Sequence, residues 1–281
     1  MTFEKINETL YIYKEKAYFD VVVGAIVLPS KIVMIDSGVN LPKTKEFREY
    51  VEKETKKKTE ILFITHSHSD HTWGNQIFAD CRIIAAPEAL TMMNQEKDKL
   101  TKESLEKIKA MMDETISLDG LVITPPTETH DYLEIVDGDM KVIFKQTGGH
   151  TADSSYVYCP NYSILFAGDN LFENFYLYGQ AETADPEKWL KAFEEYLSFD
   201  VEYYIPGHQS VCNSKTIRSY IAFLRLNKTT IQEMHSEEKT KEEIIEELTP
   251  LKPFPKTKNH PALERLKEAT IENWYNFWTK D

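Results

Sequence analysis

The sequence predicts an α/β fold in which β-strands and α-helices alternate along the first two thirds of the chain. Short runs of β-branched and aromatic residues, typical of strands, are separated by segments with the apolar spacing of amphipathic helices. Polar residues that can bind metals follow several strands, as in α/β proteins whose chemistry lies at the strand ends. The chain has 281 residues, 41% of them hydrophobic, and we expect a single domain over residues 1–281.

The N-terminal part is expected to contain three strands, then a helix and a fourth strand. The strand segments are rich in Val, Ile, Tyr and Phe, and Pro29-Ser30 predicts a tight turn between two of them. The helix has Pro42 near its start and lysines in its last turn. The expected ranges are 9–13, 19–28 and 31–36 for the first strands, 42–58 for the helix, and 60–65 for the fourth strand.

The middle of the chain is expected to contain a helical insertion over residues 88–130. A short helix at 72–78 and a strand at 81–86 precede it. Leu105, Ile108, Met112 and Ile116 have helical spacing, so 87–118 predicts one or two helices that stop at Asp119-Gly120, followed by a loop at 124–131. We expect Met92, Met93, Met111 and Met112 to pack the insertion or to form a homodimer contact; a Met-lined substrate pocket is the other interpretation.

The second half repeats the strand pattern and then becomes helical. Asp185 and Pro186 mark a helix start, and Thr240 with Glu243 forms a capping box. A helical extension over 214–281 follows the last strand. The expected ranges are 132–136, 140–146, 154–159, 163–169 and 201–208 for strands, with helices at 185–198 and 262–278.

Composition and charge restrict the partners. The formal net charge is −13, which argues against nucleic acid as a partner because phosphate binding needs Lys and Arg. The N-terminus has no signal-peptide pattern, and no apolar run is long enough to span a bilayer. The three cysteines lie far apart in sequence without zinc or redox spacing. We therefore expect a cytoplasmic protein with reduced thiols, no membrane partner and a small-molecule substrate.

The stretch FITHSHSDHTWGN, residues 63–75, carries three of the eight histidines of the chain. His66 and His68 alternate in an extended backbone, so both can reach one metal ion, while Asp70 and His71 turn toward a neighbouring point. Imidazole and carboxylate suit Zn²⁺ and, less selectively, Fe or Mn. One loop cannot close a tetrahedral shell, so further ligands must come from elsewhere.

Three other residues share the context of a strand, then glycine, then a possible ligand. They are His150 in TGGHT, Asp169 in FAGDN and His208 in IPGHQ. Glycine permits the sharp turn that aims the next side chain over the strand ends. Any one of the three alone would be a common cap or turn former, but together with residues 66–71 they predict a metal centre.

The motifs THSHSDH, GGHT, FAGD and PGH, in this order and context, resemble those of the metallo-β-lactamase superfamily across roughly residues 10–210. The resemblance implies an αββα sandwich with the site at one edge of its two sheets. It implies one metal held by His66, His68 and His150, a second held by Asp70, His71 and His208, and Asp169 bridging both. Asp36 in MIDSG resembles the first family motif, whose role is to order the ligand loop.

The resemblance implies a hydrolase with two divalent cations, most simply Zn²⁺, with Mn²⁺ or Fe²⁺ as alternatives. The cations would share a hydroxide that attacks an ester-like, thioester, lactone, amide or phosphodiester bond. Asp70 is the residue expected to help move the proton. The residues that follow Asp169 include Phe172, Phe175, Tyr176 and Tyr178, and we expect them to form an aromatic wall that contacts the substrate.

Other branches of the superfamily give alternative functions. A persulfide dioxygenase would use a single iron on the first-site ligands; a complete second site favours hydrolysis. β-Lactam hydrolysis is a second alternative, although penicillin-hydrolysing members usually lack an aspartate at the position of Asp169. Flavin-linked di-iron reductases carry Glu where His68 stands. Glyoxalase II and acyl-homoserine lactonases use all seven ligands, but the lactonase tyrosine is not found at residues 171–173. A binding or regulatory protein that kept the ligands is the remaining hypothesis.

Overall fold

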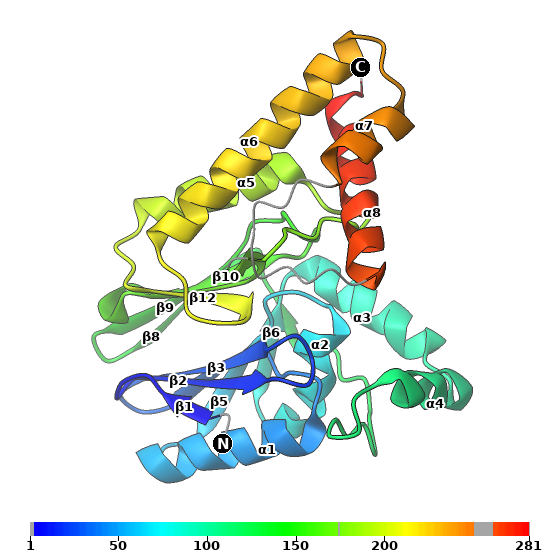
Figure 1. The fold of residues 1–281 in the computed structure, drawn as a ribbon. Helices are drawn as coiled ribbons and strands as arrows, with labels where there is room; N and C mark the ends of the chain where they lie inside the picture. The colour runs from blue at the N-terminus through cyan, green and yellow to red at the C-terminus, as the bar shows by residue number, and fades with distance from the viewer. Residues whose placement is uncertain (1–2, 174, 250–260, 281) are drawn as a thin grey trace.

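The protein is described by a computed structural model that covers residues 3–173, 175–249 and 261–280. Its strands form one curled sheet in the order β7-β6-β5-β4-β3-β12-β11-β10-β9-β8, and β2 pairs with both β1 and β3 (Figure 1). The strands are β1 (Phe3–Lys5), β2 (Leu10–Glu15), β3 (Val21–Val27), β4 (Ile32–Ile35), β5 (Thr59–Phe63), β6 (Arg82–Ala85), β7 (Glu128–Thr129), β8 (Tyr132–Asp137), β9 (Met140–Gln146), β10 (Ser155–Cys159), β11 (Ile164–Phe172) and β12 (Tyr203–His208).

The sheet is divided into two halves that face each other. Strands β3 and β12 join the halves through a single antiparallel pair, His208 with Val21. The inner faces of both halves contribute to one apolar cluster. Within it, the rings of Phe63 on β5 and Phe144 on β9 stack with centroids 5.3 Å apart. The halves therefore pack as two layers around a shared core.

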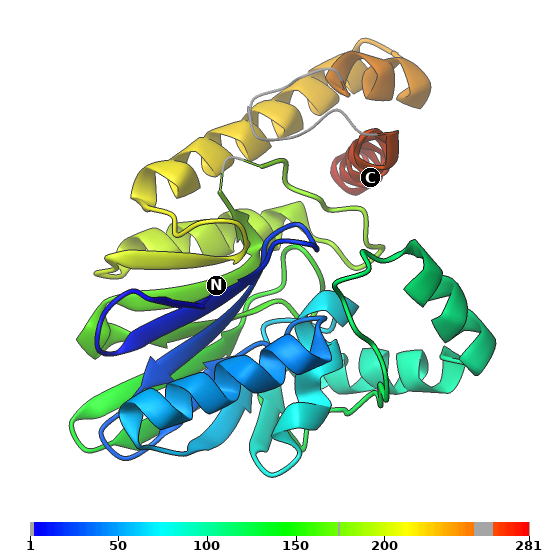
Figure 2. The same ribbon diagram turned by 60° about the horizontal axis from the view of Figure 1, so that its bottom comes forward.

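Helices cover the outer face of each half-sheet (Figure 2). Phe47 and Val51 of α1 pack against the half that contains β2 to β6, whereas Trp189 of α5 and Tyr220 of α6 pack against the other half. The result is the expected four-layer α/β/β/α arrangement. The helices are α1 (Leu41–Thr55), α2 (Ser69–Thr72), α3 (Pro87–Lys99), α4 (Lys102–Met111), α5 (Pro186–Ser198), α6 (Ser214–Ser236), α7 (Lys241–Leu248) and α8 (Pro261–Trp278), with 3₁₀ turns η1 (Trp73–Phe78) and η2 (Pro160–Tyr162).

The insertion is helical over a shorter range than the sequence predicts. Helices α3 and α4 are separated at Thr101, which caps α4 in a capping box with Ser104, and α4 ends at Met111. The prediction of helix over 112–118 is wrong. Ile116 and Leu118 are buried there in a cluster with Trp73, so their apolar spacing reflects tertiary packing of turns.

The segment 124–131, predicted as a loop, contains the short strand β7. Thr127 N–H donates to the Ile83 carbonyl at 2.8 Å and His130 N–H donates to the Ala85 carbonyl at 3.0 Å. The prediction was wrong because the open edge of β6 supplies hydrogen-bond partners that a local pattern cannot show.

The C-terminal helices pack onto the half-sheet that contains β9 to β12. Ile244 of α7 and both Ile271 and Trp274 of α8 belong to the apolar cluster of that half. The predicted N-caps at Asp185 and Thr240 are confirmed. Residues 250–260 and 281 of the predicted extension lie outside the described residues. None of the helices in the described residues is long and apolar enough to cross a membrane.

Candidate metal centre

The histidine-rich loop follows the carboxyl end of β5. Strand β5 pairs in parallel with β4 on one side and β6 on the other, so these strands end at one edge of the sheet. The chain then passes His66 and enters the short helix α2 at Ser69, with His68 in extended backbone as its N-cap. This turn directs Asp70 and His71 to a second point, as the spacing predicts.

Three histidine nitrogens converge on one position. His68 Nδ1 lies 3.1 Å from His66 Nε2 and 3.1 Å from His150 Nε2. One imidazole nitrogen has a single lone pair in the ring plane and cannot serve two hydrogen bonds well. Tetrahedral zinc with Zn–N bonds of about 2.0–2.1 Å separates its ligand atoms by about 3.3 Å. The spacing therefore fits three nitrogens around one cation.

Asp169 completes this group and faces a second one. Its Oδ2 lies 3.8 Å from His66 Nε2 and 3.7 Å from His150 Nε2. Its carboxylate is also 3.2 Å from His71 Nε2 and 3.4 Å from His208 Nε2. The second group consists of Asp70, His71 and His208. Asp70 Oδ2 lies 3.6 Å from His71 Nε2 and 3.3 Å from His208 Nε2. The structure thus brings all seven predicted ligands together.

Backbone carbonyls and one carboxylate fix which nitrogen of each histidine faces the centre. His150 Nδ1–H donates to the Tyr178 carbonyl at 2.6 Å, and His208 Nδ1–H donates to the Phe19 carbonyl at 3.1 Å. His71 Nδ1 lies 2.9 Å from the Asp36 carboxylate. In the neutral form of each imidazole, Nε2 is therefore left with a lone pair directed at the metal positions. No motif in the sequence indicates the two carbonyl partners.

Asp36 orders ligands of both groups, in line with its expected supporting role. Its carboxylate accepts from Thr65 N–H and from Thr65 Oγ1, both at 2.7 Å. Because the Thr65 hydroxyl proton is used in this bond, His66 Nδ1–H must be the donor in its 3.2 Å contact with Thr65 Oγ1. Asp36 has φ +57°, in the left-handed region that aspartate tolerates better than most residues.

Two strands carry their ligands inside the strand rather than after it. Asp169 lies within β11, and His208 is the last residue of β12. Gly168 has the left-handed φ of +53° that the prediction of a sharp turn requires. Gly207 is needed for space instead, because a Cβ there would lie 1.9 Å from Asp169 Oδ1.

Burial and charge divide the histidines into two kinds. Burial lowers the pKa of His66, and it lowers the pKa of His150 to about 4, which leaves both imidazoles neutral. Burial also acts to lower the pKa of His71 and His208. The carboxylates of Asp169 and Asp70 outweigh this effect and raise both pKa values, that of His208 to about 9. In return, the imidazoles lower the pKa of Asp70 to about 2 against the effect of burial.

Unpaired buried atoms mark where a cation fits. His71 Nε2 and Asp169 Oδ1 are buried and face each other at 3.2 Å, but neither has a hydrogen bond of suitable geometry among the described residues. Buried polar atoms normally have a partner, because leaving one unsatisfied costs about 1–3 kcal/mol. Divalent cations bound by nitrogen and carboxylate oxygen would satisfy both atoms.

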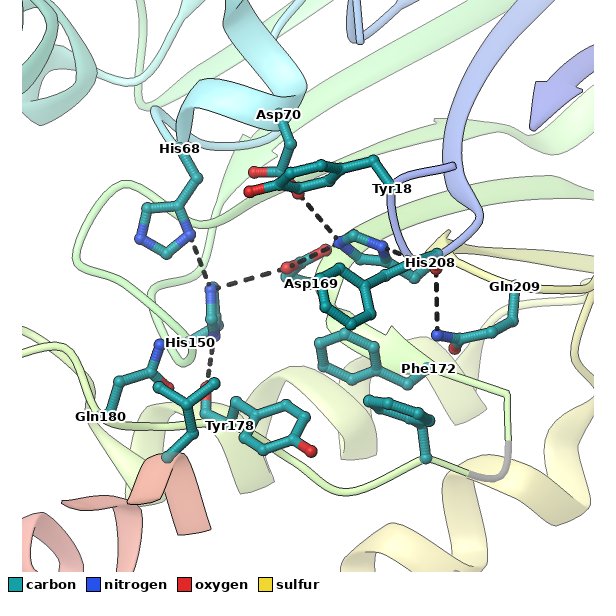
Figure 3. A pocket seen from close by; sticks show the side chains of 13 residues that line it. Tyr18, His68, Asp70, His150, Asp169, Phe172, Tyr178, Gln180, His208 and Gln209 are labelled. Carbon is teal, nitrogen blue, oxygen red and sulfur yellow. Dashed lines mark hydrogen bonds and ion pairs between the residues drawn. The ribbon is translucent and has the colours of Figure 1, made fainter. Parts of the chain in front are cut away.

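A cavity of about 200 Å³ opens beside the ligands (Figure 3). Of the predicted aromatic wall, Phe172, Phe175 and Tyr178 line it, but Tyr176 does not. The Tyr176 ring is buried near Trp274, so its expected position at the site is wrong. The insertion's methionines, Met92, Met93, Met111 and Met112, do not line this cavity. Five lining residues had no sequence signal: Tyr18, Phe19, Gln180, Gln209 and Leu266.

The C-terminal helix α8 supports one ligand indirectly. Asn273 Nδ2 donates to the Gly179 carbonyl at 2.9 Å, and Gly179 N–H donates to Thr270 Oγ1 at 3.0 Å. These bonds hold the segment whose Tyr178 carbonyl accepts from His150. Contacts over about ninety residues of separation thus reach a metal ligand, which explains why the sequence did not reveal them.

The α/β/β/α layers and the His/Asp cluster at the sheet edge define a metal-binding protein of the mixed α/β class. Residues 19–208 match the family profile of the metallo-beta-lactamase superfamily. The chain therefore belongs to this superfamily, whose members are generally hydrolases, as the motif resemblance predicts.

Known proteins with similar sequence and structure agree with this membership. A metallo-beta-lactamase type 2 of Bacillus cereus is 26% identical over 221 residues, covering 75% of this chain and 77% of the relative. The crystal structure of DIM-1 metallo-beta-lactamase aligns with a TM-score of 0.62 at 18% identity, over 80% of this chain and 96% of that one. The sec-alkylsulfatase Pisa1 from Pseudomonas sp. aligns with a TM-score of 0.70 at 15% identity, over 99% of this chain but 50% of its own.

Proposed function

We propose that this protein is a hydrolase that uses two divalent metal ions to cleave a bond of a small molecule. The observation that carries the proposal is the position of Asp169. Its carboxylate lies within 3.8 Å of Nε2 atoms from His66 and His150 on one side, and within 3.4 Å of those from His71 and His208 on the other. One carboxylate between two nitrogen groups suits a bridging ligand.

The residues divide into two sets of ligands. His66, His68 and His150 would hold one ion, Asp70, His71 and His208 the other, and Asp169 both. The nitrogen and carboxylate donors suit Zn²⁺ best, while Mn²⁺ and Fe²⁺ accept the same set. When bound, the ions would polarise a substrate oxygen and make a water molecule acidic near neutral pH. The bond cleaved would be an ester, thioester, lactone, amide or phosphodiester bond.

Asp70 is the residue suited to move a proton. Its pKa of about 2 leaves the carboxylate ionised at neutral pH, and the residue lines the cavity. One carboxylate oxygen faces the Nε2 atoms of His71 and His208. In this role, Asp70 accepts a hydrogen bond from the attacking water and guides its proton toward the leaving group.

Metal stoichiometry of the purified protein tests the proposal, measured by elemental mass spectrometry beside a His68→Ala variant. About two zinc or manganese ions per chain, reduced in the variant, together with hydrolysis of simple esters, lactones, thioesters or phosphodiesters, are expected. About one iron per chain with oxygen uptake in the presence of a persulfide would favour the dioxygenase alternative. No bound metal after reconstitution would contradict both.

β-Lactam hydrolysis is a second candidate because the curated relatives are described as metallo-beta-lactamases at 26% identity. Asp169 weighs against it, since penicillin-hydrolysing members usually lack an aspartate at this position. A chromogenic cephalosporin assayed beside the simple esters distinguishes the two. Preference for the cephalosporin would replace the broader proposal with a lactamase.

A further inference from the structure

In the part of the chain that the structure describes, the wall of the metal cavity carries no charged side chain apart from the proposed ligands. Among the described residues, the other lining residues are aromatic, aliphatic or amide: Tyr18, Phe19, Phe172, Phe175, Tyr178, Gln180, Gln209 and Leu266. Sites that select phosphate, sulfate or carboxylate groups normally offer Arg or Lys, whose geometry and charge match those anions. We infer that the substrate is an uncharged acyl compound, an ester, lactone or amide with an apolar substituent; this inference rests on the proposed hydrolase function.

An aromatic surface runs outward from the ligand His208. The Phe172 ring stacks on the His208 imidazole, with centroids 5.8 Å apart and an angle of 20° between the planes. The Phe175 ring centroid lies 6.3 Å from that of Phe172, and the Tyr178 ring centroid lies 5.7 Å from that of Phe175. Burying an apolar group against this surface is favourable by about 25 cal/mol per Å². The acyl chain or the leaving alcohol of the substrate would lie here.

A polar atom at the same cavity lacks a partner. Gln180 lines the cavity near His150, and its Oε1 is buried without a hydrogen-bond partner among the described residues (Figure 3). An amide oxygen accepts hydrogen bonds from N–H or O–H groups. The second amide, Gln209, is already engaged, since its Nε2 donates to the Phe19 carbonyl at 3.4 Å. Turned toward the cavity, the Gln180 amide would meet an uncharged N–H or O–H donor of the substrate.

The opposite side of the cavity is also uncharged. Tyr18 and Phe19 come from the turn between β2 and β3, and the Phe19 side chain is 56% exposed at the rim. A tyrosine phenol has an ordinary pKa of about 10 and is neutral at physiological pH, so Tyr18 adds no charge to the wall. A substrate anion away from the metals would therefore meet no compensating cation in the described wall.

A matched pair of substrates tests the inference on the metal-loaded protein. 4-Nitrophenyl butyrate and 4-nitrophenyl 4-sulfobutyrate share a leaving group and a similar acyl chain, but only the second carries an anion, a sulfonate too weakly nucleophilic to attack its own ester. We expect kcat/KM at least about tenfold higher for the butyrate. Equal or higher values for the sulfobutyrate, or preference for bis(4-nitrophenyl) phosphate or 4-nitrophenyl sulfate, would overturn the inference while leaving the hydrolase proposal intact.

Two variants locate the effect. Phe175→Ala should lower kcat/KM for the butyrate about tenfold, mainly through KM. Tyr132→Ala removes an exposed aromatic side chain on β8, which does not line the cavity, and should change nothing. Equal effects of the two variants would count against the aromatic surface as the substrate site.

Binding of compounds that do not react separates the inference from the proposed function. Calorimetric titration of the metal-loaded protein with 4-phenylbutanamide and with 4-phenylbutanesulfonate compares an uncharged amide with an anion on the same apolar group. Tighter binding of the amide, lost in Gln180→Ala, is expected. If the amide binds selectively but no ester is hydrolysed, the proposed function fails and the inferred class stands. If neither compound binds, or the sulfonate binds more tightly, the inference is wrong.

Discussion

The carboxylate of Asp36 lies 2.9 Å from His71 Nδ1 and also accepts a hydrogen bond from the Thr65 hydroxyl, whose oxygen faces His66. A single buried side chain therefore orients one histidine of each metal group. Strand β4 ends just before Asp36 and its parallel neighbour β5 ends just before the ligand loop, so sheet register sets this relationship. Replacement of Asp36 tests how far metal binding depends on that support.

Asp36→Asn is expected to weaken zinc binding by about 10–100-fold. Asparagine has one acceptor oxygen and cannot accept from His71 and from both donors of Thr65, so at least one buried group loses its partner, which costs about 1–3 kcal/mol in the free energy of unfolding. Competition with a chelator and urea unfolding of the metal-free protein measure the two effects.

Asp137→Asn is the matched control for this prediction. Asp137 also accepts from the N–H and hydroxyl of one residue, Ser30, both at 2.7 Å, but it is only half-buried and makes these bonds at the end of β8, away from the ligand loops. The Asp137→Asn substitution should leave the zinc affinity unchanged. Equal loss of affinity in the two variants would mean that Asp36 acts only through general stability.

Asp153→Ala should loosen the connection between the two loops that carry the three-histidine group. The Asp153 carboxylate accepts a hydrogen bond from Ser67 N–H at 2.6 Å. Asp153 lies three residues after His150 in the sequence, and Ser67 lies between His66 and His68. Removing this buried charged acceptor leaves the Ser67 N–H unpaired, so zinc affinity should fall by about 10–100-fold. Zinc competition titrations measure the change.

Asp98→Ala is the control for the loop connection, because Asp98 is exposed on α3. Unaltered affinity in Asp153→Ala would show that the ligand loops hold their positions without it.

Much of this site could be predicted because metal chemistry restricts residue types. The seven ligands occur in short motifs that follow apolar strand segments, and each is a residue type that few other roles require in that context. The pattern that placed Ile116 in a helix was as regular, yet it was produced by packing against Trp73 in a different segment. Local periodicity cannot distinguish the two cases.

The rest of the site depends on contacts that no motif carries. The carbonyls of Phe19 and Tyr178 bind ligand histidines through backbone atoms, which any residue type could supply. Tyr176 and Tyr178 are two residues apart, and only the arrangement of the segment decides that Tyr178 lines the cavity while Tyr176 packs near Trp274. Sequence composition predicted an aromatic wall but not which rings form it.

Gly207→Ala is expected to displace the Asp169 carboxylate and reduce the bound metal toward one ion per chain. The added methyl group would lie 1.9 Å from Asp169 Oδ1 and 2.9 Å from its backbone nitrogen, and two adjacent strands cannot separate to relieve both contacts. Elemental analysis after zinc reconstitution gives the stoichiometry.

Gly120→Ala supplies the comparison for this effect. Gly120 has φ +75° but nothing within 4 Å of an added Cβ, so the substitution should cost about 1 kcal/mol in the free energy of unfolding and leave the metal content unchanged. Two ions per chain in Gly207→Ala would show that Asp169 is not held as the structure describes.

Metal binding should release protons at one group and not at the other. The pKa of His208 is about 9 and that of His71 is also raised, so both are protonated at neutral pH without metal and must lose protons to become ligands. His66 and His150 have lowered pKa values and are already neutral. The zinc affinity of the group formed by Asp70, His71 and His208 should therefore rise with pH between about pH 6 and pH 9. For each proton that binding releases, the increase should be about tenfold per pH unit.

Calorimetric zinc titrations at pH 6 and pH 8, each in two buffers of different ionisation enthalpy, measure this difference. Two binding phases are expected. At pH 6 the weaker phase should be zinc binding to the group of Asp70, His71 and His208, and only this phase should release protons. His208→Ala should reduce that release by about one proton per ion bound, leaving the proton of His71, while the other phase keeps its affinity. A release shared equally by both phases would contradict the division of the histidines, because Asp169 and Asp70 then could not hold protons on His71 and His208 selectively.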